Sequence, residues 1–211
     1  MQFTLVTDGS SDRALIPVLE WLLRWLGVTE DLVGQWAELR HLRRPPVGLM
    51  NRVRKALELY PCDLLFVHRD AEAQAPQLRS AEINAAVEEI WRAGVAPIPH
   101  VCVVPVRMQE AWLLIDESAI RQAASNPNGQ MHLDMPGTID IENIPDPKER
   151  LYELIKTASG LSDRRLRKFS VSQARLQLAG RIEDYSALRG LPAFARLEQD
   201  VREVIQHSSH S

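Results

Sequence analysis

Short apolar runs alternate with longer amphipathic stretches over the first half of the chain. The apolar runs have the length and composition of buried strands, whereas the stretches between them show the apolar spacing of helices. The strand-like runs lie at residues 3–7, 34–42, 63–68 and 98–106. The helical stretches lie at about 11–26, 49–59 and 78–93. This alternation predicts an α/β fold with a mainly parallel sheet of about four strands flanked by helices.

The pattern changes after residue 109. Residues 111–115 predict a short apolar helix, and residues 125–147 are rich in Pro, Asn, Gly and Asp, which favours a long irregular connection. Further helices are expected near 147–158, 171–182 and 192–206, and the last residues, 207–211, are expected to fray. We therefore divide the chain into an α/β core, 1–116, and a mostly helical C-terminal part, 117–211, packed on that core.

Carboxylates follow three of the predicted strands. Asp8 follows the first strand, Asp70 and Glu72 follow the third, and Glu110 follows the fourth. Open α/β sheets bind ligands beyond the carboxyl ends of their strands. Several converging carboxylates supply the hard oxygen ligands that Mg²⁺ and Mn²⁺ prefer. The sequence therefore predicts a catalytic set of Asp8, Asp70, Glu72 and Glu110, in which the first three hold the metal.

The geometry of the paired carboxylates matters to this hypothesis. If the extended backbone continues past the third strand, Asp70 and Glu72 face the same side, which suits shared ligation of one ion. Asp12, by contrast, is interpreted as a favourable charge at a helix N-terminus, and Glu110 could have the same structural role. His68 is expected to be a hydrogen-bonded strand-end histidine. Arg69 could contact a phosphate or pair with a neighbouring acid.

Composition narrows the function classes. The 211 residues suffice for one large domain or a core with a small appendage, and an apolar content of 45% with 25% charged residues is ordinary for a globular protein. The net charge of -3 argues against coating nucleic acid by bulk charge, but it leaves room for a local basic groove. Two basic clusters stand out: Arg40, His41, Arg43, Arg44 with Arg52, Arg54 and Lys55, and Arg164, Arg165, Arg167 with Lys168. Each could contact phosphates or an acidic partner, or form a solvated surface.

Two further features bear on the compartment. Cys62 and Cys102 lie in or beside apolar segments and lack the spacing of a metal site, so both are expected to be buried, reduced thiols. The chain starts with a strand-like run rather than a signal peptide, and no apolar run reaches the ~18 residues of a membrane span. We therefore expect a cytoplasmic protein without a membrane partner.

The order of the acidic motifs resembles that of a TOPRIM domain, the fold shared by topoisomerases, primases and overcoming-lysogenization-defect nucleases. In that family an acidic residue and a glycine follow the first strand, as Asp8-Gly9 does here, and an acidic-x-acidic pair follows the third, as Asp70-Ala71-Glu72 does. The chain is more closely similar to an uncharacterised bacterial TOPRIM-like family often encoded beside an ATPase. The supporting segments are 7–12, 66–72, 104–114, 184–188 and 192–194.

This resemblance implies a metal-dependent nuclease or nuclease subunit that cleaves DNA or RNA, in a bacterial (antiphage) defence system with an ATPase partner, and a homo-oligomer is compatible with it. Arg107 and Lys168 are candidates, by charge and reach, for stabilising the transition state. The sequence departs from the family at Asp8, where Glu is usual, and at Glu72, where a second Asp is usual.

Two other functions stay open. The Glu-to-Asp departure and the acidic net charge motivate a non-catalytic TOPRIM-like binding or regulatory subunit of an ATPase complex. Phosphate-ester chemistry on a small molecule ranks last, because a nucleophilic aspartate would need a D-x-D arrangement that residues 8–10 lack.

Overall fold

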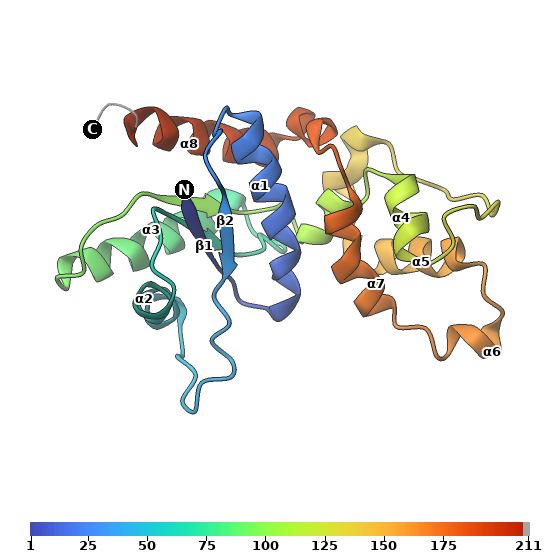
Figure 1. The fold of residues 1–211 in the computed structure, drawn as a ribbon, viewed down its shortest axis with the longest axis horizontal. Coiled ribbons are helices and arrows are strands. Elements are labelled where there is room, and N and C mark those ends of the chain that lie inside the picture. The colour runs from blue at the N-terminus through green and yellow to red at the C-terminus, as the bar shows by residue number, and fades with distance from the viewer. Residues whose placement is uncertain (209–211) are drawn as a thin grey trace.

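A four-stranded, all-parallel sheet with the strand order β2-β1-β3-β4 organises the computed structural model, which describes residues 1–208 (Figure 1). The strands are β1 (Gln2–Val6), β2 (Val33–Trp36), β3 (Leu64–His68) and β4 (His100–Val103). β1 and β3 occupy the centre, with Phe3 opposite Leu64 and Val6 opposite Val67. The predicted α/β class with a parallel sheet of four strands is confirmed.

Helices cover both faces of the sheet. On one face α1 (Leu15–Trp25) and α8 (Pro192–Ser208) pack against inward-pointing residues such as Phe3 and Phe66. On the other face α2 (Leu49–Leu59) and α3 (Pro76–Arg92) pack against residues such as Val67. Successive strand residues point to opposite faces, so the continuous apolar run of β3 serves both layers, as expected for a strand buried on both sides.

After β4 the polypeptide forms a helical part that lies beside the sheet, and it then returns to the sheet through α8 (Figure 1). A 3-10 helix, η2, leads from the sheet into this part, and α8 leads back from it to β4. Its elements are η2 (Gln109–Leu113), α4 (Glu117–Ala123), η3 (Thr138–Asn143), α5 (Pro147–Ser159), α6 (Asp163–Leu166), α7 (Val171–Leu178), η4 (Ala179–Arg181) and η5 (Ser186–Gly190). One cluster of buried apolar side chains runs from Phe3 to Val201 across residue 116, so the C-terminal part shares the core of the sheet.

The structure refines the expected elements. The helix expected from residue 11 starts as a 3-10 turn, η1 (Ser10–Ala14), before α1 begins. β4 is shorter than the apolar run at 98–106, because prolines flank it on both sides. Of the segment expected to fray, residues 207 and 208 belong to α8, while 209–211 lie outside the described residues.

Two smaller expectations concern the thiols and the membrane. Cys62 and Cys102 are both free, as expected, but each is only partly buried. Within residues 1–208, no helix combines the length and the apolar character needed to cross a membrane.

Candidate functional site

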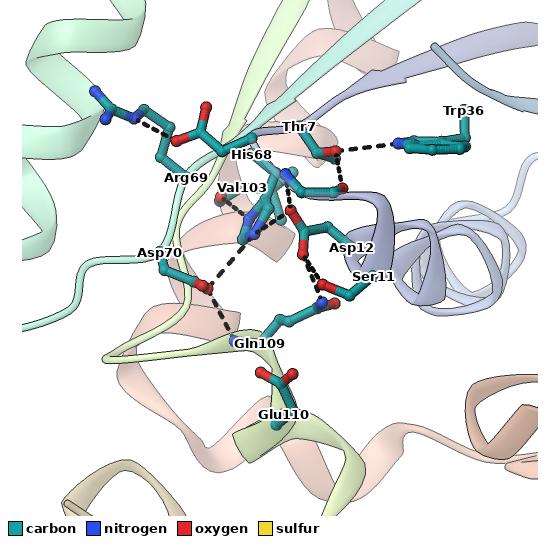
Figure 2. Close-up of polar contacts among 12 residues, drawn as sticks. Thr7, Ser11, Asp12, Trp36, His68, Arg69, Asp70, Val103, Gln109 and Glu110 are labelled. Carbon is teal, nitrogen blue, oxygen red and sulfur yellow. Dashed lines mark hydrogen bonds and ion pairs between the residues drawn. The ribbon is translucent and has the colours of Figure 1, made fainter. Parts of the chain in front are cut away.

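The loop after β1 is fixed by a small set of hydrogen bonds. Thr7 Oγ1 donates to the Gly9 carbonyl at 2.7 Å and accepts from the Trp36 indole Nε1 at 3.0 Å (Figure 2). The Gly9 N–H donates to Asp12 Oδ2 at 2.8 Å. A Cβ on Gly9 would stand only 3.1 Å from that oxygen, so the close approach of the two residues favours glycine. Asp12 is thereby held at the start of η1, as its expected role at a helix N-terminus requires.

His68, the last residue of β3, stands between two carboxylates (Figure 2). Its Nδ1 lies 2.9 Å from the Val103 carbonyl, which can only accept, so Nδ1 carries a proton. Its Nε2 lies 3.4 Å from Asp70 Oδ1 and 3.8 Å from Asp12 Oδ2. Nε2 and the carboxylate oxygens are all acceptors unless protonated, so these contacts are favourable only when a proton resides on Nε2 or on a carboxylate. The expectation of a hydrogen-bonded histidine is confirmed, and the ring also bridges two acids.

Gln109 joins the same two acids from the start of η2. Its backbone N–H donates to Asp70 Oδ1 at 2.9 Å, and its side-chain Nε2 donates to Asp12 Oδ1 at 2.9 Å. Figure 2 shows both contacts, with Glu110 just beyond. A residue 97 positions from Asp12 along the chain therefore fixes the orientation of that carboxylate.

The pKa of Asp70 is raised from 3.8 to about 6. Burial, which removes water from the carboxylate, is the main cause, and the negative charges of Asp12 and Glu110 add to it. His68 and the Gln109 N–H act in the opposite direction. Asp70 therefore exchanges its proton closer to neutral pH than an ordinary aspartate, as carboxylates in active sites often do.

Glu110 forms a buried ion pair with Arg175 of α7, and the side chain of each is 5% exposed. Helix α7 belongs to the helical part, so this pair ties that part to the edge of the sheet. Glu110 lies in the first turn of η2, where a negative charge is favourable. The alternative role expected for Glu110, a favourable charge at a helix N-terminus, therefore also agrees with the structure.

Asp8 and Glu72 are paired with arginines. Asp8 Oδ1 accepts from Arg52, and Asp8 Oδ2 accepts from Arg69 Nε at 3.2 Å. Glu72 Oε2 accepts from Arg79 Nη2 at 3.0 Å. Of the two roles expected for Arg69, the structure shows the pairing with an acid.

The expected extended geometry from Asp70 to Glu72 is wrong. β3 ends at His68, and Glu72 has a φ of 54°, in the left-handed region. Its N–H is bonded to the Arg107 carbonyl at 2.9 Å, which holds the turn in place. The reversal directs the largely exposed Glu72 side chain toward Arg79, whereas Asp70 accepts from Gln109, so the two side chains do not share one side.

The structure thus brings Asp70, Glu110 and the additional acid Asp12 together, and places Asp8 and Glu72 in arginine pairs beside them. Within residues 1–208, no group of three or more His, Cys, Asp or Glu side chains is arranged to hold a metal ion. The donors are of the type that Mg²⁺ prefers, but the set Asp8, Asp70 and Glu72 does not fit a cation while these arginine pairs are closed.

The two expected basic helpers lie in different places. Arg107 has a φ of 60° and its carbonyl contacts Glu72, so its backbone lies at the acidic edge. Lys168 follows α6, which lies at the end of the helical part remote from the sheet (Figure 1). Of the two residues, Arg107 is therefore the better placed to act at the acidic edge.

Comparison with protein-family models, curated proteins and solved structures finds no match to this chain.

Proposed function

We propose that this chain is a TOPRIM-like, metal-dependent nuclease or nuclease subunit that cleaves phosphodiester bonds of DNA or RNA. The observation that carries the proposal is the gathering of Asp12, Asp70 and Glu110 at the carboxyl edge of a parallel sheet, with the pKa of Asp70 raised to about 6. Open α/β sheets bind ligands at this edge, and strongly perturbed carboxylates are typical of active sites. The resemblance of the motifs Asp8-Gly9 and Asp70-Ala71-Glu72 to a TOPRIM domain supplies the reaction class.

The proposed cofactor is Mg²⁺ or Mn²⁺, which in phosphodiester hydrolysis neutralises phosphate charge and lowers the pKa of a bound water. Asp8, Asp70 and Glu72 remain the proposed ligands, with Glu110 as the fourth acid, and the arginine pairs of Asp8 and Glu72 must open for them to act.

Without a bound cation, a proton shared between Asp70 Oδ1 and His68 Nε2 can be exchanged near neutral pH, because the pKa of Asp70 lies at about 6. A divalent ion bound to Asp70 would displace this proton. Gln109 keeps the Asp70 carboxylate in one orientation. We place the protein in the cytoplasm, where it would act with nucleic acid and an ATPase partner.

The test is a cleavage assay on plasmid DNA and on RNA with Mg²⁺ or Mn²⁺. Asp70→Asn removes the charge at nearly constant shape, and we expect it to abolish cleavage. Asp163→Asn is the matched control, because Asp163 is an exposed residue of α6, remote from the sheet. Equal cleavage by the wild type and Asp70→Asn would reject the assignment.

A non-catalytic binding or regulatory subunit is the second candidate, favoured by one observation. Asp8 and Glu72, two of the three proposed ligands, are neutralised by arginines in the way structural ion pairs are. Calorimetric titration with Mn²⁺ separates the candidates. Binding that disappears in Asp70→Asn counts against the non-catalytic role, and the lack of binding together with the lack of cleavage would favour it.

A further inference from the structure

A groove of about 970 Å³ runs along the outer edge of β4, between α3 and α8. Its floor is formed by residues 99–106, and its walls are formed by residues 76–84 of α3 and 192–207 of α8. The volume lies at the upper end of the range of ligand pockets, about 300–1,000 Å³. Neither Asp12 nor Asp70 lines the groove, so it is separate from the acidic edge.

β4 is the outermost strand of the sheet, and the outer side of its backbone faces this groove. The Pro99 carbonyl accepts from the Leu65 N–H at 3.0 Å, so it points toward β3. Backbone groups alternate in direction along a strand, so the N–H and C=O groups of His100 and Cys102 point away from β3. Within residues 1–208 the sheet has no strand beyond β4 that could pair with them.

The polar side chains on the floor are held by α3. His100 Nε2 lies 3.0 Å from Asn84 Oδ1, and the Cys102 thiol donates to the same oxygen at 3.3 Å. These contacts fix both β4 side chains, so the backbone of the strand offers the hydrogen-bonding groups for a ligand. An edge strand with outward N–H and C=O groups is a template on which one further strand can form.

The shape of the groove favours a single extended peptide over a second copy of the protein. Residues of both α3 and α8 line the space beyond β4, so both helices extend past the edge of the sheet. A second copy would bring its own α3 and α8 into this space before two β4 strands could approach to the ~4.8 Å of paired strands. A peptide without flanking helices meets no such obstacle.

The α8 wall favours a positively charged occupant. Asp200 pairs with Arg196 Nε at 2.9 Å, and its side chain is 23% exposed. Burial raises the pKa of Asp200 in spite of this pair, and the nearby Glu203 carboxylate raises it further. Burial also raises the pKa of the Cys102 thiol to about 12, and Asp200 adds to that shift, so its negative charge reaches the floor. The groove lining holds two acids and one arginine, which favours a cationic side chain on the ligand.

The two walls also differ in polarity. The α8 wall carries Leu197 and Val204 on either side of Asp200, whereas the α3 wall carries Ser80 and Asn84. Successive side chains of a strand point to opposite faces, so an added strand would direct alternate residues to the two walls. A matching peptide therefore has a lysine or arginine between two apolar residues on one face, and small polar residues on the other.

We propose that the β4 edge is a peptide-binding groove, in which an extended segment of a partner protein adds a fifth strand beside β4 and places a lysine or arginine side chain on Asp200 and Glu203. Main-chain hydrogen bonds to His100 and Cys102 supply affinity, and the α8 acids supply specificity. The inference is independent of the proposed nuclease function, because none of these residues belongs to the acidic edge.

The test is fluorescence anisotropy of the whole chain with labelled heptapeptides of the form Thr-Val-Thr-X-Thr-Val-Thr, in which X is Lys, Arg, Ala or Glu. Position X and the two valines lie on one face of the extended peptide, and the threonines lie on the other. We expect the Lys and Arg peptides to bind at least about tenfold more tightly than the Glu peptide. Equal affinities for all four peptides, or no binding by any of them, would overturn the groove.

A double variant, Asp200→Asn with Glu203→Gln, removes the charge of the α8 wall at nearly constant shape. We expect the preference for the Lys peptide over the Glu peptide to fall to about twofold or less, and the affinity for the Ala peptide to stay the same. Asp163→Asn is the matched control, because Asp163 is an exposed residue of α6, remote from the sheet. An unchanged preference in the folded double variant contradicts the role of α8.

His100→Pro tests the added strand, because it removes an outward N–H without removing a bond to β3. His100 is the first residue of an edge strand, a position where proline is tolerated. His100→Ala is the matched control, because it loses the same side chain and keeps the N–H. We expect the proline variant to bind the Lys peptide about two- to tenfold more weakly than the alanine variant. Equal affinities in the two variants would show that the peptide does not pair with β4.

Light scattering distinguishes a peptide from a second copy as the occupant of the groove. We expect the molar mass of the protein to be the same with and without the Lys peptide. A dimer that dissociates as the peptide binds would show that β4 pairs with its own copy, and it would overturn the proposal.

Discussion

The backbone N–H of Gln109 donates to Asp70 Oδ1 at 2.9 Å, and this bond joins the end of β3 to the start of η2. The side chain of the same glutamine donates to Asp12 Oδ1. Gln109 is buried, and it is a neutral residue that holds two like charges in fixed positions. The acidic edge is therefore organised by a residue that carries no charge.

Replacing Gln109 by Met should destabilise the fold through Asp12. The variant keeps the backbone bond to Asp70 but removes the donor to a carboxylate that is only 7% exposed. We expect a loss of about 1–3 kcal/mol in the free energy of unfolding, measured by urea denaturation. Gln199→Met is the control, because Gln199 bonds Glu203 on the exposed side of α8. A loss no larger than that of the control would contradict the role of Gln109.

Asp70→Asn should make the protein more stable at alkaline pH. The folded-state pKa of about 6 exceeds the ordinary value of 3.8, so ionisation of Asp70 disfavours the folded state. The penalty is absent below pH 4, grows between pH 4 and 6, and is complete above pH 6. The asparagine variant carries no such penalty. We therefore expect its free energy of unfolding to exceed that of the wild type by about 1–3 kcal/mol at pH 8, and by less as the pH falls toward 4. Thermal unfolding across this pH range measures it, and a gain independent of pH would contradict the shifted pKa.

Gly9→Ala should displace Asp12 without altering the backbone conformation. Gly9 has a φ of -121°, which alanine adopts readily, so the cost arises only from the new Cβ at 3.1 Å from the Asp12 carboxylate. We expect a destabilisation of about 1–2 kcal/mol, within the range of overpacked sites, by thermal unfolding. Gly180→Ala is the matched control, because a Cβ there meets no atom within 4 Å. Equal melting temperatures for the two variants would contradict the close approach.

Arg175→Met should destabilise the protein strongly, because it leaves Glu110 buried without its partner. We expect the free energy of unfolding in urea to fall by about 3–5 kcal/mol. Adding Glu110→Gln should restore much of this stability, since the buried charge is then removed. Arg92→Met, which breaks an exposed pair, should change stability by less than about 0.5 kcal/mol. Failure of the second substitution to restore stability would show that Arg175 acts through packing alone.

The sequence predicted the sheet well because each strand has a local signature. The apolar run ending at His68 and the amphipathic stretch at 49–59 both reappear in the structure almost unchanged. The helices α4 and α6 escaped prediction because they have only seven and four residues, too few for a clear apolar period. The division at residue 116 stays a prediction, since the shared core crosses it.

The site was predictable in its location but not in its pairings. Acids after strand ends pointed to the carboxyl edge, where Asp70 and Glu110 do lie near each other. The pairing of Glu110 with Arg175 joins residues 65 positions apart, and such contacts leave no local pattern. One signal could have placed Asp12 at the site, namely its position in the same short loop as Asp8. No comparable signal in the sequence pointed to its partner Gln109. The left-handed φ of Glu72 also has no sequence signature, because glutamate rarely adopts it.

The most direct measurement is the rate of plasmid cleavage in Mn²⁺ by the wild type and by Asp70→Asn, both at pH 8 and both shown to be folded. If the Asp70 carboxylate takes part in phosphodiester hydrolysis, the substitution should lower the rate at least about 100-fold even though it stabilises the fold. Equal rates for the two proteins would contradict a catalytic role for this acidic edge.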